Sequence, residues 1–552
     1  MSSLTLRKAL SVLAKSSSFS VVTLTNRRRN ALDDLKQRLF VEQKIESDIK
    51  KCLGSLNSRE IVFLCGSSGD GKSEILTRCY NHYKHKCDFH LDATHSFSPH
   101  QSAIETLDKL FDAYKEGNRP LVLGINTGML ANFSMEGSEC HNDIKSAIDY
   151  FFNYSSNTQM PYYIDGLYFF DFEHYPKFQF NEHKNYSFFA KELMTKLTEE
   201  NDENLFYVIA KKNDEQAGLA DSERQIIANF KLLSIPSVQN VIITQLFKVR
   251  LMKDQFVTTR ALLDLFHHLL LGPGYLFDNL FIGEENELVQ RIADFDPASL
   301  HTYELDQFVL RYELGLADSE LDDFLKELAK KYIYFERSQA KPGDAASLIR
   351  LFSLLRADEF GNNYHRKFES FFQETLLEKY ACIWHLHANY TGDRIQKMEL
   401  RRFYSSELIA AILSYANRKA PELTTNKDEL FLGAFGSIKV TAPVALKGDY
   451  DAILKKHVTK PACFDAYLKI GDHPLKPISI NLNLFELLSK LNNGYRPNKY
   501  DKNATVLLDE IIEQITEQAK SSSSLKFYDG KRIYIAKEDD DMITISGMNG
   551  VA

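Results

Sequence analysis

The segment GSSGDGKS, residues 66–73, constrains this 552-residue chain more than any other feature. Its three glycines tolerate positive φ and carry no Cβ that would block a bound group. Successive N–H groups of such a loop point inward as an anion nest, and a following helix adds the positive end of its dipole. Residues 60–65 contain a continuous apolar run that begins at Ile61, and residues 73–83 are helical in pattern. A strand, a glycine loop and a helix in this order predict a phosphate-binding site.

The same loop fits the pattern G-x-x-x-x-G-K-[ST], which is typical of P-loops that bind ATP. We expect Lys72 to face solvent in the loop and to reach the β- and γ-phosphates, and Ser73 to hold Mg²⁺ through its hydroxyl. Asp70 carries the wrong charge for phosphate, and we expect it to cap the following helix. The residues predicted to contact the nucleotide are Gly66, Ser67, Ser68, Gly69, Asp70, Gly71, Lys72, Ser73 and Glu74.

Strand-like and helix-like segments alternate from residue 57 to about residue 205. Such alternation predicts an α/β fold, a parallel sheet with helices on both faces. The strand-like segments are residues 60–65, 87–94, 119–126 and 162–173, and the helical ones are residues 73–83, 102–117 and 143–152.

The pattern changes twice after this region. Long amphipathic stretches to about residue 420 predict helices, and the remainder is strand-rich with one helix at residues 505–520. At roughly 100–200 residues per domain, the length allows three to five units. We predict an N-terminal helical lead (1–56), a P-loop core (57–205), a helical lid (206–300), a helical domain (301–425) and a C-terminal α+β domain (426–552).

ATP hydrolysis also requires a carboxylate that acts on Mg²⁺ and water. No apolar run followed by Asp-Glu occurs in the chain. Asp92 closes the strand-like segment 87–94, and Asp171 lies near the end of the segment 162–173. Either residue fits a Walker B acid, and either fits an ordinary turn or N-cap carboxylate. We prefer Asp92 slightly, as a metal ligand beside Ser73.

Two further residues resemble the sensors of AAA+ ATPases. Asn126 ends the strand-like segment 119–126, where a polar side chain lies beside bound phosphates. Arg260 opens a predicted helix in the lid and resembles the sensor-2 arginine. An asparagine in a turn before glycine and a surface arginine are the alternative interpretations.

Longer stretches resemble one family. CGSSGDGKSEIL, LDATHSFSPHQSAIETLDKLFDAYKEG, RPLVLGINTGMLANF and ISINLNLFELLSKLNNGYRPNKYDKN together resemble DptF, the ATPase component of the DptFGH system for phosphorothioation-dependent DNA restriction. The resemblance runs from about residue 30 to the end of the chain, and only its Walker A residues carry over directly.

The resemblance implies a Mg²⁺-dependent ATPase that drives or gates damage to DNA lacking sulfur in its backbone. DptG-like and DptH-like subunits would be its partners, and it would meet DNA directly or through them. A homo-oligomer is a further option. Composition and spacing by themselves indicate only a nucleotide-binding α/β domain with helical and mixed appendages.

Direct DNA contact has three candidate segments, although the net charge of −8 argues against a generally cationic surface. Basic residues mix with aromatic ones, as in surfaces that track a nucleic-acid backbone and stack bases. A solvated charged face is the alternative for each segment. No nuclease pattern occurs. The segments are residues 26–30; Arg394, Lys397 and Arg401 with Phe403 and Tyr404; and Arg496, Lys499 and Lys502 with two tyrosines.

Cysteine usage bears on the compartment. The seven cysteines form no CxxC pair, which is typical of a reducing compartment. His385 and His387 lie near Cys382; a buried helix is favoured over a zinc site because no second ligand pair follows. No apolar run approaches about 18 residues, so we expect no membrane span. The basic first 32 residues fit a transit peptide or, preferably, a helix and a Ser-rich linker. The sequence predicts a cytoplasmic protein.

Other functions remain open. The sequence has no clear Walker B motif. A nucleotide-dependent scaffold that hydrolyses ATP slowly or not at all is therefore an alternative. A STAND-like signalling ATPase, with the helical middle as relay, is another interpretation. A small-molecule kinase is disfavoured because the helical and mixed regions exceed what such an enzyme needs.

Overall fold

The structure is a computed structural model, and packing divides the chain into two compact units. The first combines Met1–Phe178 with Tyr186–Gln373, and the second combines Gln179–Asn185 with Glu374–Ala552. The residues described are 4–14, 31–93, 102–154, 161–181, 184–335, 341–357, 359–420, 428–455, 462–520, 522–530, 532–539 and 542–549.

A five-stranded, mostly parallel sheet organises the amino-terminal half of the first unit. Its order is β2-β3-β1-β5-β4, and only the edge strand β4 runs antiparallel. The predicted mixed α/β class is therefore confirmed. The strands are β1 (Ile61–Gly66), β2 (Asp88–His90), β3 (Leu121–Asn126), β4 (Tyr162–Ile164) and β5 (Leu167–Asp171).

One strand prediction was wrong. The segment 162–173 is not a single strand but the hairpin of β4 and β5. Asp165 and Gly166 both have positive φ, 47° and 84°, which suits a tight two-residue hairpin turn. The Asp-Gly pair in YYIDGLYFF is the sequence signal for this turn.

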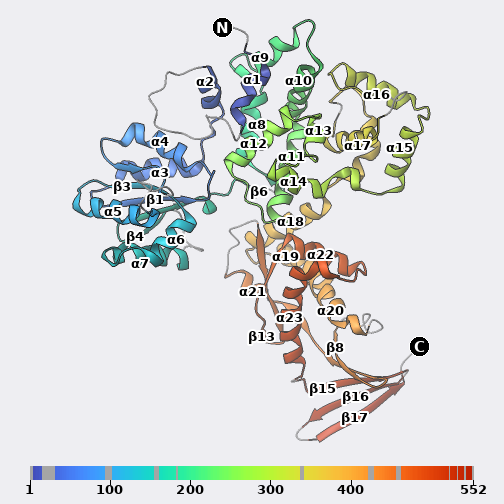
Figure 1. The fold of residues 1–552 in the computed structure, drawn as a ribbon. Coiled ribbons are helices and arrows are strands. Elements are labelled where there is room, and N and C mark those ends of the chain that lie inside the picture. Colours follow the sequence, from blue (N-terminus) through green and yellow to red (C-terminus); the bar gives the residue numbers. More distant parts are fainter. Residues whose placement is uncertain are drawn as a thin grey trace. The chain divides into compact units, whose positions relative to one another are not determined.

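Helices cover both faces of this sheet (Figure 1). Every residue of β1 is buried, which explains the continuous run of apolar residues in this central strand. Phe63 of β1 packs toward one helical layer, and Val62 and Leu64 pack toward the other. One layer is α3 (Lys44–Ser55) and α4 (Lys72–Tyr83); the other is α5 (Ala103–Glu116), α6 (Thr127–Glu136) and α7 (Asn142–Tyr154).

The rest of the first unit is helical. Residues near the amino terminus join this helical part: Arg7 of α1 (Leu6–Leu10) pairs with Glu223 at 2.6 Å. The remaining helices are α8 (Phe188–Thr198), α9 (Leu205–Asp214), α10 (Asp221–Ser234), α11 (Pro236–Met252), α12 (Thr259–Leu271), α13 (Leu276–Asn279), α14 (Glu287–Ile292), α15 (Tyr303–Glu313), α16 (Ser319–Ala329) and α17 (Asp344–Leu354).

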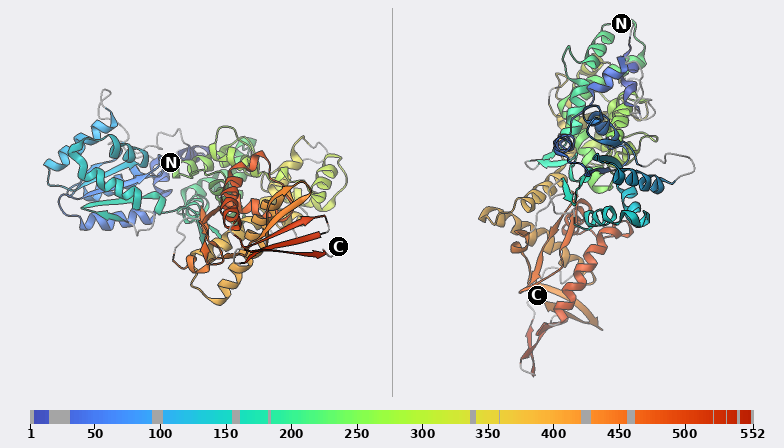
Figure 2. Two further views of the ribbon diagram at one scale, coloured as in Figure 1. Left: turned by 90° about the horizontal axis from the view of Figure 1, so that it is seen from below. Right: turned by 90° about the vertical axis from the view of Figure 1, so that its left-hand side faces the viewer.

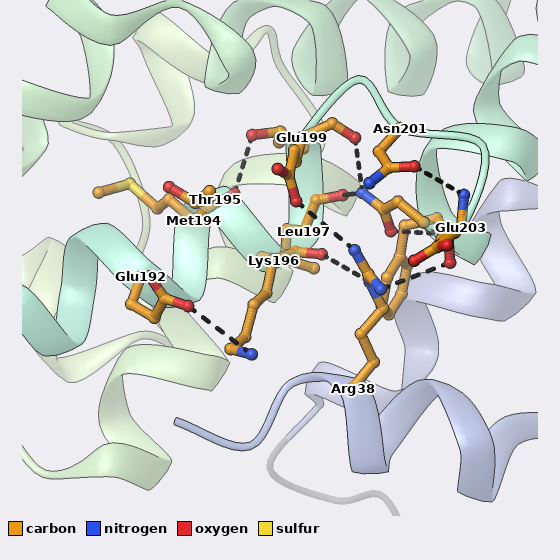
Figure 3. A network of polar contacts seen from close by, with 12 residues as sticks. Arg38, Glu192, Met194, Thr195, Lys196, Leu197, Glu199, Asn201 and Glu203 are labelled. Carbon is orange, nitrogen blue, oxygen red and sulfur yellow. Dashed lines mark hydrogen bonds and ion pairs between the residues drawn. The ribbon is translucent and has the colours of Figure 1, made fainter. Parts of the chain in front are cut away.

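Arg38, the last residue of α2 (Ala31–Arg38), fastens that helix to the end of α8. Figure 3 shows its guanidinium beside the last turn of α8 and the residues after it: it donates to the carbonyl oxygens of Lys196 and Glu203, both at 3.4 Å, and lies 3.7 Å from the Glu199 carboxylate. A cation at a helix carboxyl terminus is favoured because it meets orphan carbonyl groups there.

The second unit contains a five-stranded antiparallel sheet of order β17-β16-β15-β9-β8, so the predicted C-terminal strands and helix are present. Figure 2 shows β15 to β17 extending beyond the helices of this unit. Its main elements are β6 (Gln179–Asn181), α18 (Thr375–Ala388), α19 (Arg394–Phe403), α20 (Ala410–Ala416), β8 (Glu429–Phe435), β9 (Ile438–Pro443), β11 (Cys463–Ala466), β14 (Ile478–Asn481), α22 (Leu482–Asn492), α23 (Lys502–Lys520), β15 (Ser524–Asp529), β16 (Arg532–Asp539) and β17 (Met542–Asn549).

Within the described residues, no helix taken singly has both the length and the apolar composition needed to cross a membrane. Only α10 and α11 counted together meet that requirement, and the two are bent by 81° at their junction.

Candidate functional site

The predicted site residues lie at the carboxyl edge of the parallel sheet. Gly66 of β1 is in register with Asn126 of β3, and Cys65 of β1 with Asp171 of β5. The chain passes from β1 through α4 to β2, and β3 then takes the place between them. The carboxyl ends of β1 and β3 therefore form a topological switch point, which is where ligands bind in such sheets.

The glycines of the loop have two different physical roles. Gly69 and Gly71 have φ of +87° and +104°, a region that other residues rarely adopt. Gly66 is needed for close packing instead: a Cβ there would lie 2.9 Å from the Phe172 ring and 3.0 Å from the Asp70 carboxylate. The loop thus has the backbone geometry that the sequence suggested.

Lys72 is held inside the loop, so the expectation of a solvent-facing lysine was wrong. Its ammonium donates to the carbonyl oxygens of Gly66 and Ser67, at 3.0 and 2.8 Å, and to Asn126 Oδ1 at 2.7 Å. Burial lowers the pKa of Lys72, although the charges of Asp70 and Asp92 act in the opposite direction. The structure therefore brings together Lys72 and Asn126, residues 54 positions apart.

Asp70 does not cap α4, contrary to the expectation. Among the described side chains none caps this helix, whose N-cap is Gly71. Asp70 Oδ2 instead accepts the N–H of Ser67 at 2.7 Å, and Oδ1 lies 2.8 Å from the ammonium of Lys177. Both members of this ion pair are about one-tenth exposed. Lys177 thus neutralises the negative charge that the loop carries within itself.

The first turn of α4 offers donors and one hydroxyl to a ligand. The first N–H groups of a helix lack intrahelical acceptors, and no described side chain satisfies them here. The Ser73 hydroxyl lies in this turn, and no described residue bonds it. Glu74 pairs with Arg78 at 3.0 Å and so belongs to the helix surface. This donor set, with the Lys72 ammonium, fits a phosphate chain and the Mg²⁺ that accompanies it.

The two candidate acids differ in their surroundings. Asp92 follows β2, is exposed, and lies close enough to Lys72 to act on its pKa. Asp171 is buried; its Oδ1 accepts the N–H of Glu173 at 3.0 Å, and its Oδ2 lies 3.4 Å from His174 Nδ1. Asp171 therefore caps the short 3₁₀ turn Phe172–His174. Of the two acids, Asp92 is the exposed one, and its charge acts on Lys72.

Arg260 meets the glycine loop through its backbone. Its backbone N–H, an orphan donor of the first turn of α12, donates to the carbonyl of Gly69 at 3.2 Å. Next to it, the Thr259 hydroxyl donates to the carbonyl of Asp70 at 3.1 Å. Among the described residues, no partner bonds the Arg260 guanidinium. The outer side of the loop is thereby fastened to α12.

The predicted DNA-binding segments differ in how far their side chains are exposed. Arg394, Lys397 and Arg401 are exposed on α19, but Phe403 and Tyr404 are buried at 1% exposure. The idea that these two aromatics stack bases was therefore wrong. In the loop after α22, Tyr500 is 84% exposed beside Lys499; Arg496 and Lys502 are exposed there too. Residues 26–30 lie outside the described residues.

The histidine pair lies on α18, and its second member is buried there. His387 is buried, donates through Nδ1 to the Ile383 carbonyl at 2.9 Å, and meets the Tyr404 hydroxyl at 3.2 Å through Nε2. Burial lowers its pKa to about 4. Within the described part of the chain no cluster of metal-ligating side chains is found. The favoured interpretation, a buried helix, accounts for these contacts.

Sequence reasoning missed Lys177 and Thr259. Each meets the loop from more than 100 positions away, at 107 and 189 residues from Asp70. No local pattern marks either residue. Comparison of the chain with protein-family models, with curated proteins and with solved structures finds no match.

Proposed function

We propose that the chain is a Mg²⁺-dependent P-loop ATPase, as its resemblance to DptF implies. The observation that carries this proposal is the buried Lys72 ammonium, bonded to the carbonyls of its own glycine loop and to Asn126 on the neighbouring strand. A cation held at a switch point beside an uncapped helix is suited to a phosphate chain. ATP is the nucleotide that the G-x-x-x-x-G-K-[ST] pattern and the resemblance favour.

Each residue has a distinct role in this proposal. Lys72 binds the β- and γ-phosphates, and the N–H groups of the loop and of the first turn of α4 bind the phosphate oxygens. Ser73 and Asp92 hold Mg²⁺, which neutralises charge on the β- and γ-phosphates when bound. The side-chain amide of Asn126 donates to the γ-phosphate. Arg260, on α12, supplies a second cation. Asp171 shapes the edge of the site by capping the turn after β5.

The biological setting follows from the DptF resemblance and is part of the proposal. The chain acts in a cytoplasmic, phosphorothioation-dependent restriction complex with DptG-like and DptH-like subunits, in which ATP use drives or gates DNA damage. A direct DNA contact is best supported at the loop after α22, because Tyr500, Lys499 and Arg496 are exposed there together.

The test is ATP hydrolysis by the purified chain with and without duplex DNA, beside Lys72→Ala. Turnover that requires Lys72 and rises with DNA supports the whole proposal. If DNA does not change the rate of ATP hydrolysis, the contact with DNA is assigned to the partner subunits. Normal ATP affinity in Lys72→Ala overturns the phosphate site.

A nucleotide-dependent scaffold is the second candidate, and one observation favours it. Asp92 is followed by Ala93, so no carboxylate stands next to the metal acid to act on water, and Asp171 is occupied as a cap. ATP bound with no turnover, with or without DNA, would select this candidate.

A further inference from the structure

Lys177 stands at the base of a short hairpin that belongs to the other unit. The hairpin consists of β6 (Gln179–Asn181) and β7 (Lys184–Tyr186), and Gln179–Asn185 packs with the second unit. The chain thus leaves the first unit immediately after Lys177 and Phe178, and it returns at Tyr186. We call this element the linking hairpin.

The base of the linking hairpin is fixed within the first unit. The Ser187 hydroxyl donates to the Lys177 carbonyl at 2.6 Å, and it also accepts the Ala190 N–H as the N-cap of α8. Phe178, between Lys177 and the hairpin, packs edge-on against Phe247 with ring centroids 5.3 Å apart. A displacement of Lys177 would therefore be passed to both ends of the hairpin.

The hairpin side chain Phe180 is fixed within the second unit. It is 7% exposed, and its ring centroid lies 5.3 Å from that of Trp384 and 6.0 Å from that of Tyr380, both on α18. Trp384 is the single tryptophan of the chain. One covalent segment therefore joins the partner of Asp70 to an aromatic cluster that carries a natural fluorophore.

The charges at the loop make this connection sensitive to phosphate. Lys177 neutralises Asp70, whose other carboxylate oxygen holds the Ser67 N–H. Burial is the main reason that the pKa of Lys72 is lowered, and the charge of Lys177 adds to the effect, so the two ammonium groups share one neighbourhood. A triphosphate placed on Lys72 competes with Asp70 for Lys177, because buried ammonium groups move toward added negative charge.

We propose that Lys177 is a positioning residue that links nucleotide occupancy of the glycine loop to the packing of the linking hairpin in the second unit. This inference rests on the proposed function, since it takes the ligand to be a nucleotide. The contacts of Lys177 and Phe178 lie within the first unit, those of Phe180 lie within the second, and the covalent hairpin connects the two.

The test uses Trp384 fluorescence of the full chain during titration with Mg²⁺ and a non-hydrolysable ATP analogue, while calorimetry measures binding separately. We expect a saturable fluorescence change in the wild type, reduced at least fivefold in Lys177→Met and in Asp70→Asn. The double variant should lose no more than either single one. Lys177→Arg should restore part of the signal because it keeps the charge.

Two controls make the readout specific. Lys326→Met removes an exposed ammonium that pairs with Asp323 at 2.8 Å, and it should leave the signal unchanged. Phe180→Leu should remove the signal while calorimetric binding stays within about threefold of the wild type, because Phe180 packs against Trp384 and Tyr380 and has no part in the proposed phosphate site.

The outcomes separate the two proposals. Calorimetric binding with no Trp384 response, or an equal response in Lys177→Met, overturns the role of Lys177 and leaves the ATP site intact. A wild type that does not bind the analogue overturns the proposed function and this inference with it. Circular dichroism of each variant identifies any that fail to fold. If Lys177→Met fails to fold, Asp70→Asn tests the role of the ion pair, because it keeps the size of the side chain.

Discussion

Asn126 Oδ1 accepts a hydrogen bond from the Lys72 ammonium at 2.7 Å. A lysine ammonium only donates, so the amide oxygen must face it and the amide NH₂ must face away. Among the described residues no partner bonds these two amide donors, so they are available to another acceptor. In the ATPase that we propose, that acceptor is the γ-phosphate.

Asn126→Ala should consequently lower kcat more than it weakens binding. Removing one donor aimed at developing charge costs about 10²- to 10³-fold in rate in other enzymes. We expect a fall of about 10²-fold in kcat and a change in KM of less than about fivefold, measured by steady-state ATP hydrolysis. Asn240→Ala on α11 is the control. A large rise in KM with unchanged kcat would contradict the sensor role.

Lys72→Ala should also destabilise the first unit, because the lysine is buried. The substitution leaves the buried Gly66 carbonyl without the lysine donor, whereas the Ser67 carbonyl keeps the N–H of Asp70. Unsatisfied buried polar groups cost roughly 1–3 kcal/mol, so we expect the free energy of unfolding to fall by about that amount. Thermal unfolding without nucleotide measures the effect. An unchanged Tm would mean that the ammonium does not hold the loop in solution.

The sheet and the loop were predictable because their signals are local. Strand β1 reads as a continuous apolar run, and the glycines of residues 66–73 follow directly, so the strand and the glycine loop could be placed from the sequence. The β4–β5 hairpin was missed although Asp165 and Gly166 mark its turn. The apolar residues on both sides of this turn made the segment resemble one long strand.

The contacts around Asp70 were not predictable, because they join distant positions. Its charge is compensated by Lys177, and its carbonyl is bonded by Thr259 of α12. In the sequence Asp70 looks like a helix cap, since a carboxylate before a helix has that role most often. The prediction for Phe403 and Tyr404 was wrong for a similar reason: they lie next to basic residues of α19 in the sequence, but their side chains are buried.

The second unit should lose stability as the pH falls, through His387. Its pKa is about 4 in the folded protein, and about 6.5 is typical of an unfolded chain. Between these values the unfolded state binds more protons. The free energy of unfolding should therefore fall from pH 6.5 to pH 4, by roughly 3 kcal/mol in total.

Denaturant unfolding followed by Trp384 fluorescence at several pH values measures this loss. His387→Gln should flatten the dependence between pH 6.5 and pH 4, because glutamine does not titrate. The exposed His301 provides the control, and His301→Gln should keep the wild-type slope. Equal slopes in the wild type and His387→Gln would show that another group titrates instead.

Gly69→Ala should weaken nucleotide binding through α12. Gly69 has φ of +87°, and an added Cβ would lie 3.2 Å from both the Arg260 Cβ and the Thr258 hydroxyl. A methyl group there pushes α12 from the loop and stretches the bond from the Arg260 N–H to the Gly69 carbonyl. We expect at least a tenfold loss in ATP affinity by calorimetry.

Gly218→Ala is a matched control, because Gly218 has a similar φ of +73° with nothing within 4 Å of an added Cβ. Both substitutions carry the same backbone strain, about 1–2 kcal/mol, since a side chain is disfavoured at positive φ. Gly69→Ala should therefore lower Tm at least as much as Gly218→Ala does, because it adds a contact with α12, and only Gly69→Ala should lose affinity. If both bind ATP alike, the contact between the loop and α12 has no part in holding the nucleotide.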